Sequence, residues 1–90
     1  MMGFRLNTTL EFALENDGKK LRLEVYENGV EKVCRKETFK NLQRFIGSDE
    51  KQLFKGRLQL HKEKGDITVI IKGEDAGKVS IEEFSDYMKK

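Results

Sequence analysis

The sequence predicts a mixed α+β fold with the element order β-β-β-α-β-β-α, in which one antiparallel sheet carries two helices on a single face. Three observations support this fold class. Apolar and polar residues alternate in several segments, apolar residues recur every three or four positions in two others, and a hairpin followed by a short helix occurs twice. The two copies are offset by roughly 45 to 48 positions, which predicts a weak internal duplication whose halves cover each other's apolar faces.

The first half of the chain shows the strand pattern most clearly. Residues 4–14 carry apolar side chains at nearly every even position and mostly polar ones at odd positions, a period of two that predicts one strand with one buried face. Turn-forming residues at 16–18 (Asn-Asp-Gly) and 28–29 (Asn-Gly) supply the positive φ that tight hairpins need. They predict two further strands, over residues 21–25 and 30–36.

The period changes at residues 38–46. Apolar residues recur there at spacings of three and four, which places them on one stripe of a helix that Gly47 can end. A further helical turn is expected over residues 48–54, before Gly56. The apolar stripe of the helix consists of Phe39, Leu42, Phe45 and Ile46.

The second half repeats the hairpin and the helix in shorter form. Residues 57–63 and 66–72 alternate around a Lys-Gly turn, which predicts the second hairpin. Ser80 and Glu83 have the spacing of a capping box, in which each side chain accepts a hydrogen bond from the other residue's backbone N–H. This box predicts a helix over residues 81–89. The side chains expected to face inward are Ile81, Phe84 and either Met88 or Tyr87.

Composition limits the class of protein. A chain of 90 residues, 37% hydrophobic and 38% charged, suits a single domain spanning residues 1–90, since a chain of this size buries only roughly 60 to 65% of its unfolded surface. No apolar run approaches the roughly 18 residues of a membrane span, and the first residues do not resemble a signal peptide. Cys34 is the only cysteine. These features predict a cytoplasmic protein in a reducing compartment, with no membrane partner.

The residue types that enzymes use are scarce. His61 is the only histidine, and its position next to Leu60 places it on the outer face of the predicted strand. Cys34 is expected to be a small core residue, in a strand where either Val33 or Cys34 faces inward. Residues 73–78 begin with glycine and end with lysine, as phosphate-binding loops do, but they carry two acids where phosphates would lie. The sequence therefore predicts no enzyme, no catalytic residue, no metal site and no cofactor.

Charge is distributed unevenly along the chain. The formal net charge is +2, but residues 1–31, 32–64 and 65–90 carry net charges of −2, +6 and −2. A basic centre between mildly acidic flanks suits a polyanion partner. It equally suits packing between copies of the protein, so self-association is also an open expectation.

Five cations of this centre are the candidate binding residues. Lys36, Lys40 and Arg44 are spaced four apart, which is expected to align them on one helical stripe opposite the apolar one, and Lys55 and Arg57 extend the positive segment. Several cations on one rigid element can contact successive phosphates. The leading hypothesis is a small non-enzymatic protein that binds nucleic acid through a basic helix and an adjoining strand. The alternative is a protein-interaction module, such as an inhibitor or adaptor encoded by a phage or other mobile element.

Residues 77–84, Gly-Lys-Val-Ser-Ile-Glu-Glu-Phe, are expected to lead into the closing helix. An antiparallel sheet that ends in a helix entered in this way resembles the single-stranded nucleic-acid binders of the PUR-repeat and positive-cofactor-4 types. The resemblance covers part of the second half and implies a curved sheet that grips a nucleic-acid strand. The chain departs from that pattern, because each half is expected to hold two or three strands rather than four. The resemblance assigns no binding residue.

Overall fold

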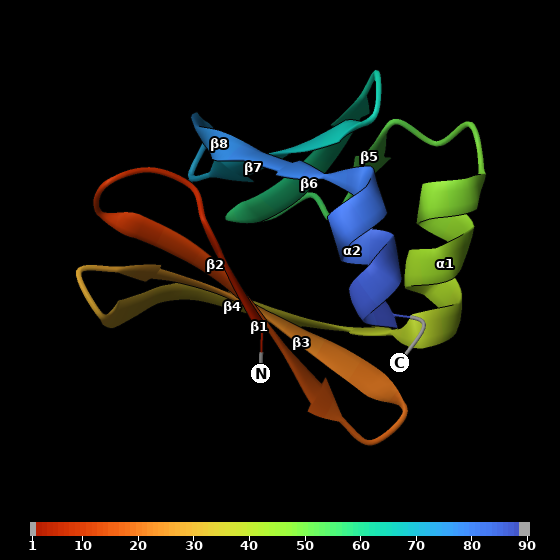
Figure 1. Ribbon diagram of the computed structural model, residues 1–90, viewed down its shortest axis with the longest axis horizontal. Coiled ribbons are helices and arrows are strands. Elements are labelled where there is room, and N and C mark those ends of the chain that lie inside the picture. Colours follow the sequence, from red (N-terminus) through yellow and green to blue (C-terminus); the bar gives the residue numbers. More distant parts are fainter. Residues whose placement is uncertain (1, 89–90) are drawn as a thin grey trace.

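The computed structural model describes residues 2–88, which form two four-stranded antiparallel sheets and two helices (Figure 1). Within each sheet the strands lie in chain order, and a helix follows each sheet along the chain. The first sheet and its helix comprise β1 (Met2–Arg5), β2 (Leu10–Asp17), β3 (Lys20–Glu27), β4 (Val30–Thr38) and α1 (Phe39–Gly47). The second sheet and its helix comprise β5 (Gln52–Leu53), β6 (Leu58–Glu63), β7 (Asp66–Ile71), β8 (Glu74–Ser80) and α2 (Ile81–Met88).

The α+β class is confirmed, whereas the predicted single sheet with the order β-β-β-α-β-β-α is wrong. The strands form two sheets, and each half contains four strands before its helix. The expectation of only two or three strands in each half is therefore wrong. The predicted hairpins around the turns at 16–18, 28–29 and 64–65 are all present.

Residues 4–14 form parts of two strands rather than one. The turn between them is held by Asn7, whose side-chain oxygen accepts hydrogen bonds from the backbone N–H groups of Thr9 (2.9 Å) and Leu10 (3.0 Å). A side-chain bond of this kind gives the backbone an alternative to the strand ladder. The chain then reverses, so that β1 pairs antiparallel with β2. Apolar residues alternate on both sides of the turn, which is why the pattern suggested a single strand.

The sequence does not predict β5 or β8. Residues 48–54 do not form the expected helical turn, because they include β5, which pairs with β6 over only two residues. Two residues are too few to show alternation. In β8, Gly77 has a φ of +134° and the register with β7 shifts. Its buried residues Ala76 and Val79 are consequently three positions apart, which hides the period of two.

The helices lie side by side between the two sheets, at one end of the molecule (Figure 1). Leu42 and Phe45 of α1 and Phe84 of α2 are fully buried. The Phe84 ring stacks on Phe12 of β2 with ring centroids 6.4 Å apart, so the helix of the second half packs on the sheet of the first. Both sheets and both helices contribute to one apolar cluster.

Both helices begin after a hydroxyl side chain. Thr38 Oγ1 accepts a hydrogen bond from the backbone N–H of Asn41 (3.2 Å), and Ser80 Oγ accepts one from Glu83 (3.3 Å). These bonds satisfy N–H groups that a helix leaves without a partner at its start. The predicted position of Ser80 before the closing helix is confirmed, whereas the predicted helix end at Lys89 lies outside the described residues.

Replacing Ser80 with Ala is expected to lower the free energy of unfolding by about 1 kcal/mol, because the backbone N–H of Glu83 loses its acceptor. Urea unfolding followed by circular dichroism measures the change. Ser80→Asp keeps an acceptor at this position and should retain most of the stability. Equal stabilities of the wild type and Ser80→Ala would contradict the capping role.

Candidate nucleic-acid interface

Lys36 does not lie on a helix. It belongs to β4, opposite Arg22 of β3, while α1 begins at Phe39. The predicted helical stripe of three cations is therefore wrong, because side chains of a strand alternate between two faces instead of following a helical period. Lys36 Nζ forms an ion pair with Asp17 Oδ2 at 2.8 Å, and this hydrogen bond lowers the pKa of the Asp17 carboxyl. The charge of Lys36 is thus partly compensated.

Lys40 and Arg44 form a pair on the exposed side of α1. They are four residues apart, about one helical turn, whereas Leu42 and Phe45 face the core. Neither cation forms an ion pair with any residue in the range 2–88. Because α1 contains no acidic residue, this side of the helix is basic.

Lys55 and Arg57 are exposed in the connection between β5 and β6, and Arg35 of β4 joins them there. The Arg35 guanidinium lies over the Phe54 ring, 4.5 Å from its centroid. Its Nη1 also lies beside Gly56, where an added Cβ would be only 3.1 Å away. We call Arg35, Lys55 and Arg57 the basic cluster. The basic cluster thus combines one cation from the first half of the chain with two from the second half.

Arg35 belongs to the basic centre of the sequence but is not among the five candidate binding residues. Strand alternation contains the signal, since Arg35 follows the buried Val33 by two positions and so lies on the same face of β4. A cation on that face must reach solvent or a partner, and Arg35 does so by lying over an aromatic ring. The structure therefore divides the five predicted residues into three places: Lys55 and Arg57 in the basic cluster, Lys40 and Arg44 on α1, and Lys36 on the outer face of the first sheet.

A hollow of about 300 Å³ lies between β4 and the start of β6, beside the basic cluster. Two of its charged residues are engaged elsewhere, since Glu31 pairs with Arg22 (3.3 Å) and Lys32 pairs with Glu27 (3.6 Å). The two arginines that line the hollow, Arg35 and Arg57, form no ion pair in the described part of the chain. The hollow is lined by Glu31, Lys32, Val33, Cys34, Arg35, Arg57 and Leu58.

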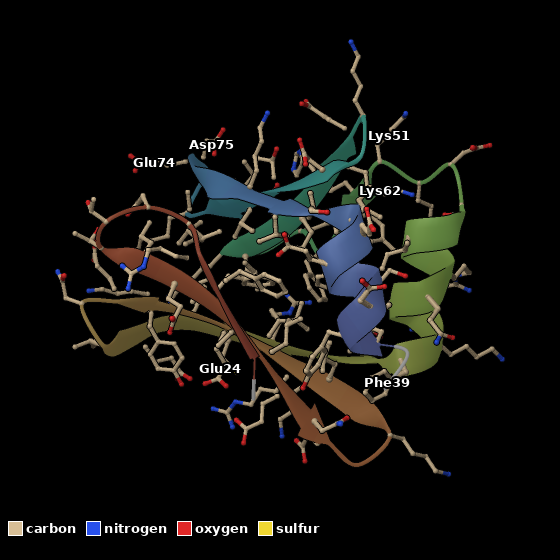
Figure 2. All side chains as sticks on the ribbon, in the orientation of Figure 1. Glu24, Phe39, Lys51, Lys62, Glu74 and Asp75 are labelled. Carbon is tan, nitrogen blue, oxygen red and sulfur yellow. The ribbon has the colours of Figure 1, made fainter. Side chains whose placement is uncertain are left out.

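Lys62 is not part of the candidate interface, because its side chain stabilises the end of α1. It lies in β6, and its ammonium group reaches the carboxyl end of α1 (Figure 2). Nζ donates hydrogen bonds to the backbone oxygens of Phe45, Ile46 (3.4 Å) and Ser48 (2.6 Å). These carbonyls would otherwise have no partner within the helix. Lys62 is therefore removed from the basic surface that the linear charge count suggests.

On the outer face of the first sheet, a buried glutamate is held by a tyrosine and an arginine. Glu24 of β3, only 2% exposed, lies on the side of this sheet away from the second sheet (Figure 2). It accepts a hydrogen bond from the Tyr26 hydroxyl (2.6 Å), and Arg22 Nε lies 3.5 Å from its carboxylate. Burial alone would raise the pKa of Glu24, but hydrogen bonding with Glu31 and Tyr26, together with the nearby Arg22 charge, holds that pKa below its ordinary value. The bond to Glu24 raises the pKa of Tyr26 to about 12.

Tyr26 is therefore expected to ionise only near pH 12, and at a lower pH in Glu24→Gln, since an amide carries no negative charge that opposes tyrosinate formation. The ultraviolet absorbance of tyrosinate measures this titration. A Tyr87→Phe background makes Tyr26 the only tyrosine of the chain. An identical midpoint with and without the Glu24→Gln change would show that the hydrogen bond does not control Tyr26.

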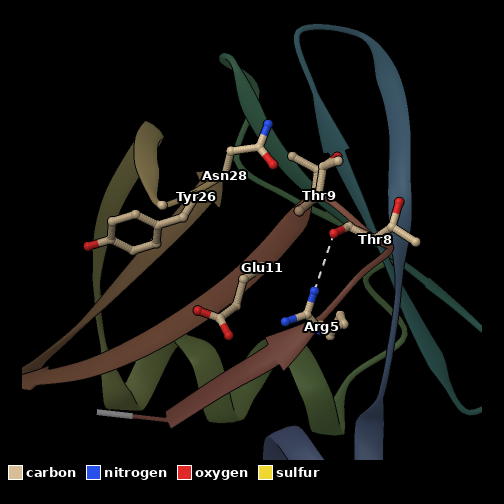
Figure 3. Close-up of a pocket in the computed structure, with 8 residues that line it drawn as sticks. Arg5, Thr8, Thr9, Glu11, Tyr26 and Asn28 are labelled. Atoms are coloured by element: carbon tan, nitrogen blue, oxygen red, sulfur yellow. Dashed lines mark hydrogen bonds between the residues drawn. The ribbon is translucent and has the colours of Figure 1, made fainter.

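A second hollow, of about 510 Å³, lies where β2 begins and β3 ends (Figure 3). Arg5 and Glu11 stand opposite each other in the register of β1 and β2, so the hollow contains one charge of each sign. Arg5 Nη1 donates a hydrogen bond to the Thr8 carbonyl (3.3 Å). This hollow lacks the excess of positive charge that phosphate contacts need, and we do not include it in the candidate interface.

His61 and Cys34 lie on different sheets. His61 contacts Gln59 at 3.0 Å, and Cys34 stands opposite Glu24. Val33, not Cys34, is the buried residue of β4, so the expectation that Cys34 is a core residue is wrong. Among residues 2–88 there is no group of three side chains that could hold a metal ion.

Comparison with known proteins finds no matching family model, no similar curated protein and no similar solved structure. In the described part of the chain, no helix is long and apolar enough to cross a membrane.

Proposed function

We propose that this protein binds nucleic acid through the basic cluster and the exposed cations of α1. The observation that supports this most is the gathering of Arg35, Lys55 and Arg57 around Gly56, where none of the three has an acidic partner among the described residues. Lys40 and Arg44 add two further cations on a rigid helix.

The proposed binding is electrostatic. Cations that neutralise phosphates release counterions, so affinity falls linearly with salt concentration on logarithmic scales. The cations of this surface are long and exposed, and such contacts position a protein on the nucleic-acid backbone without distinguishing bases. We therefore propose binding without strong sequence preference, in a cytoplasmic setting that suits the single Cys34.

The test is fluorescence anisotropy with labelled single- and double-stranded oligonucleotides over a range of salt concentrations. Wild-type protein should bind at low salt. The double variant Lys55→Glu/Arg57→Glu should lose at least about tenfold in affinity, and its salt slope should fall by about 2, because two phosphate contacts are removed. Lys78→Glu, which reverses one charge instead of two, is a control outside the interface, since Lys78 is exposed on β8, across the second sheet from β5.

Two further results separate the parts of the interface. Lys40→Glu/Arg44→Glu should also weaken binding, because both cations are uncompensated within residues 2–88. Lys36→Glu should have a smaller effect, since Lys36 already pairs with Asp17. Wild-type protein that binds no oligonucleotide at low salt would contradict the proposal. The protein-interaction module, including self-association, would then be the hypothesis to pursue.

A further inference from the structure

The position of Arg35 depends on an unusual backbone conformation at Phe54. Phe54 has a φ of +69°, in the left-handed region that bulky residues rarely adopt. Its ring is nevertheless buried, and its carbonyl accepts a hydrogen bond from Gln52 Nε2 (3.0 Å). Such conformations persist only where the surroundings determine them, and they concentrate at functional sites. Here the conformation places the ring beneath the Arg35 guanidinium.

Arg35 and Arg57 both line the same hollow. Each has five N–H donors, and neither side chain donates a hydrogen bond to any part of residues 2–88. The neighbouring Glu31 is already paired with Arg22, so it does not compensate them. A flat ring under Arg35 also reduces the rotamer freedom that the side chain would lose on binding. The two arginines thus have unused hydrogen-bond donors, and the Phe54 ring holds the Arg35 guanidinium in one orientation.

We propose that Arg35 and Arg57 form a clamp for one phosphate group, in which Phe54 orients Arg35 for bidentate hydrogen bonding. This inference rests on the proposed nucleic-acid function and assigns it a specific phosphate position. A planar guanidinium can donate two parallel hydrogen bonds to phosphate oxygens, whereas a lysine ammonium acts as a point charge. The planar shape of the Arg35 guanidinium is therefore expected to contribute to phosphate binding, whereas the cations of α1 contribute through their charge alone.

Conservative variants test this difference. Arg35→Lys keeps the charge but loses the fork, and should weaken binding of a labelled single-stranded oligonucleotide about tenfold with little change in salt slope. Arg5→Lys, at an exposed arginine outside the candidate interface, is the matched control and should stay within about twofold. Phe54→Leu keeps every cation and removes only the ring, so it should weaken binding in the same direction as Arg35→Lys. Circular dichroism melts show whether each variant is folded.

A second measurement does not require nucleic acid. Inorganic phosphate should shift the side-chain Nε–Hε signals of Arg35 and Arg57 in nuclear magnetic resonance spectra, and should leave those of Arg5 and Arg44 in place. Gly56→Ala, whose Cβ would lie 3.1 Å from Arg35 Nη1, should reduce the Arg35 shift.

The outcomes separate the clamp from the general function. If Arg35→Lys binds as well as Arg5→Lys while the wild type binds with normal salt dependence, the clamp is wrong and nucleic-acid binding stands. If phosphate shifts Arg35 and Arg57 selectively but no oligonucleotide binds, the clamp stands as a phosphate site and the proposed function is wrong. Equal shifts of all four arginines would overturn the clamp.

Discussion

Phe12→Asp is expected to unfold the protein. Phe12 is fully buried in β2, and its ring lies 6.4 Å from that of Phe84 and 6.3 Å from that of Phe4. Loss of a buried phenylalanine costs about 3 to 5 kcal/mol, and burial of an unpaired carboxylate adds several more. A domain of this size is typically stable by only roughly 5 to 13 kcal/mol. Circular dichroism should show a loss of secondary structure without denaturant.

Glu11→Gln is the control for this variant. Glu11 is the preceding residue of β2, and its side chain is exposed on the opposite face. Its replacement should change the free energy of unfolding by no more than about 0.5 kcal/mol. If Phe12→Asp melts at the same temperature as Glu11→Gln, then Phe12 does not join the two halves of the core.

Elements with strong local patterns could be predicted from the sequence. The hairpins at the Asn-Asp-Gly and Asn-Gly turns, the helix that starts after Thr38 and the cap at Ser80 all depend on interactions between residues close in the chain. The elements that the sequence did not predict depend on pairing with other strands. β5 exists only through its pairing with β6, and β8 contains a shift in register that conceals its alternation. A single strand split by the Asn7 turn also has the same apolar period as an unbroken one.

The candidate interface could be predicted only in part, because the sequence gives charges but not their partners. Lys36 of β4 pairs with Asp17 of β2, nineteen positions earlier, because both strands pair with β3. Lys62 is drawn to the end of α1, and Arg35 is placed over Phe54 by contact between the two halves. Each of these outcomes depends on tertiary structure. The sequence therefore shows where basic residues are concentrated, but it does not distinguish the ones that stay exposed and unpaired in the fold.

The internal duplication stays a prediction. The two halves share an order of four strands and one helix, and each helix follows the edge strand of its own sheet. Their cross-contacts also correspond, since Arg35 of β4 lies against Phe54 after β5, while Gly77 of β8 lies against Leu6 after β1. In both cases the last strand of one half meets the end of the first strand of the other. Such an arrangement explains why neither half would bury its apolar face alone.

Lys62 provides one of the bonds between the halves, and its charge reversal is expected to have the second largest effect on stability. In Lys62→Glu the backbone oxygen of Ser48 loses its donor, and that of Phe45 keeps only the 3.5 Å hydrogen bond from the Ser48 hydroxyl. A carboxylate also replaces the ammonium group beside the negative end of the α1 dipole. Part-buried acceptors without partners cost about 1 to 3 kcal/mol, and the unfavourable charge adds to this. We therefore expect a loss of at least about 3 kcal/mol in urea unfolding.

Three comparisons distinguish the causes of that loss. Lys62→Arg keeps a cationic donor and should retain most of the stability, whereas Lys62→Met keeps the aliphatic length and should lose about 1 to 3 kcal/mol through the unpaired carbonyls. Lys64→Glu makes the same charge change at an exposed position two residues away and should have little effect. Hydrogen exchange should locate the damage in the last turn of α1. Equal stabilities of Lys62→Glu and Lys64→Glu would mean that the attachment of α1 to the second sheet does not depend on Lys62.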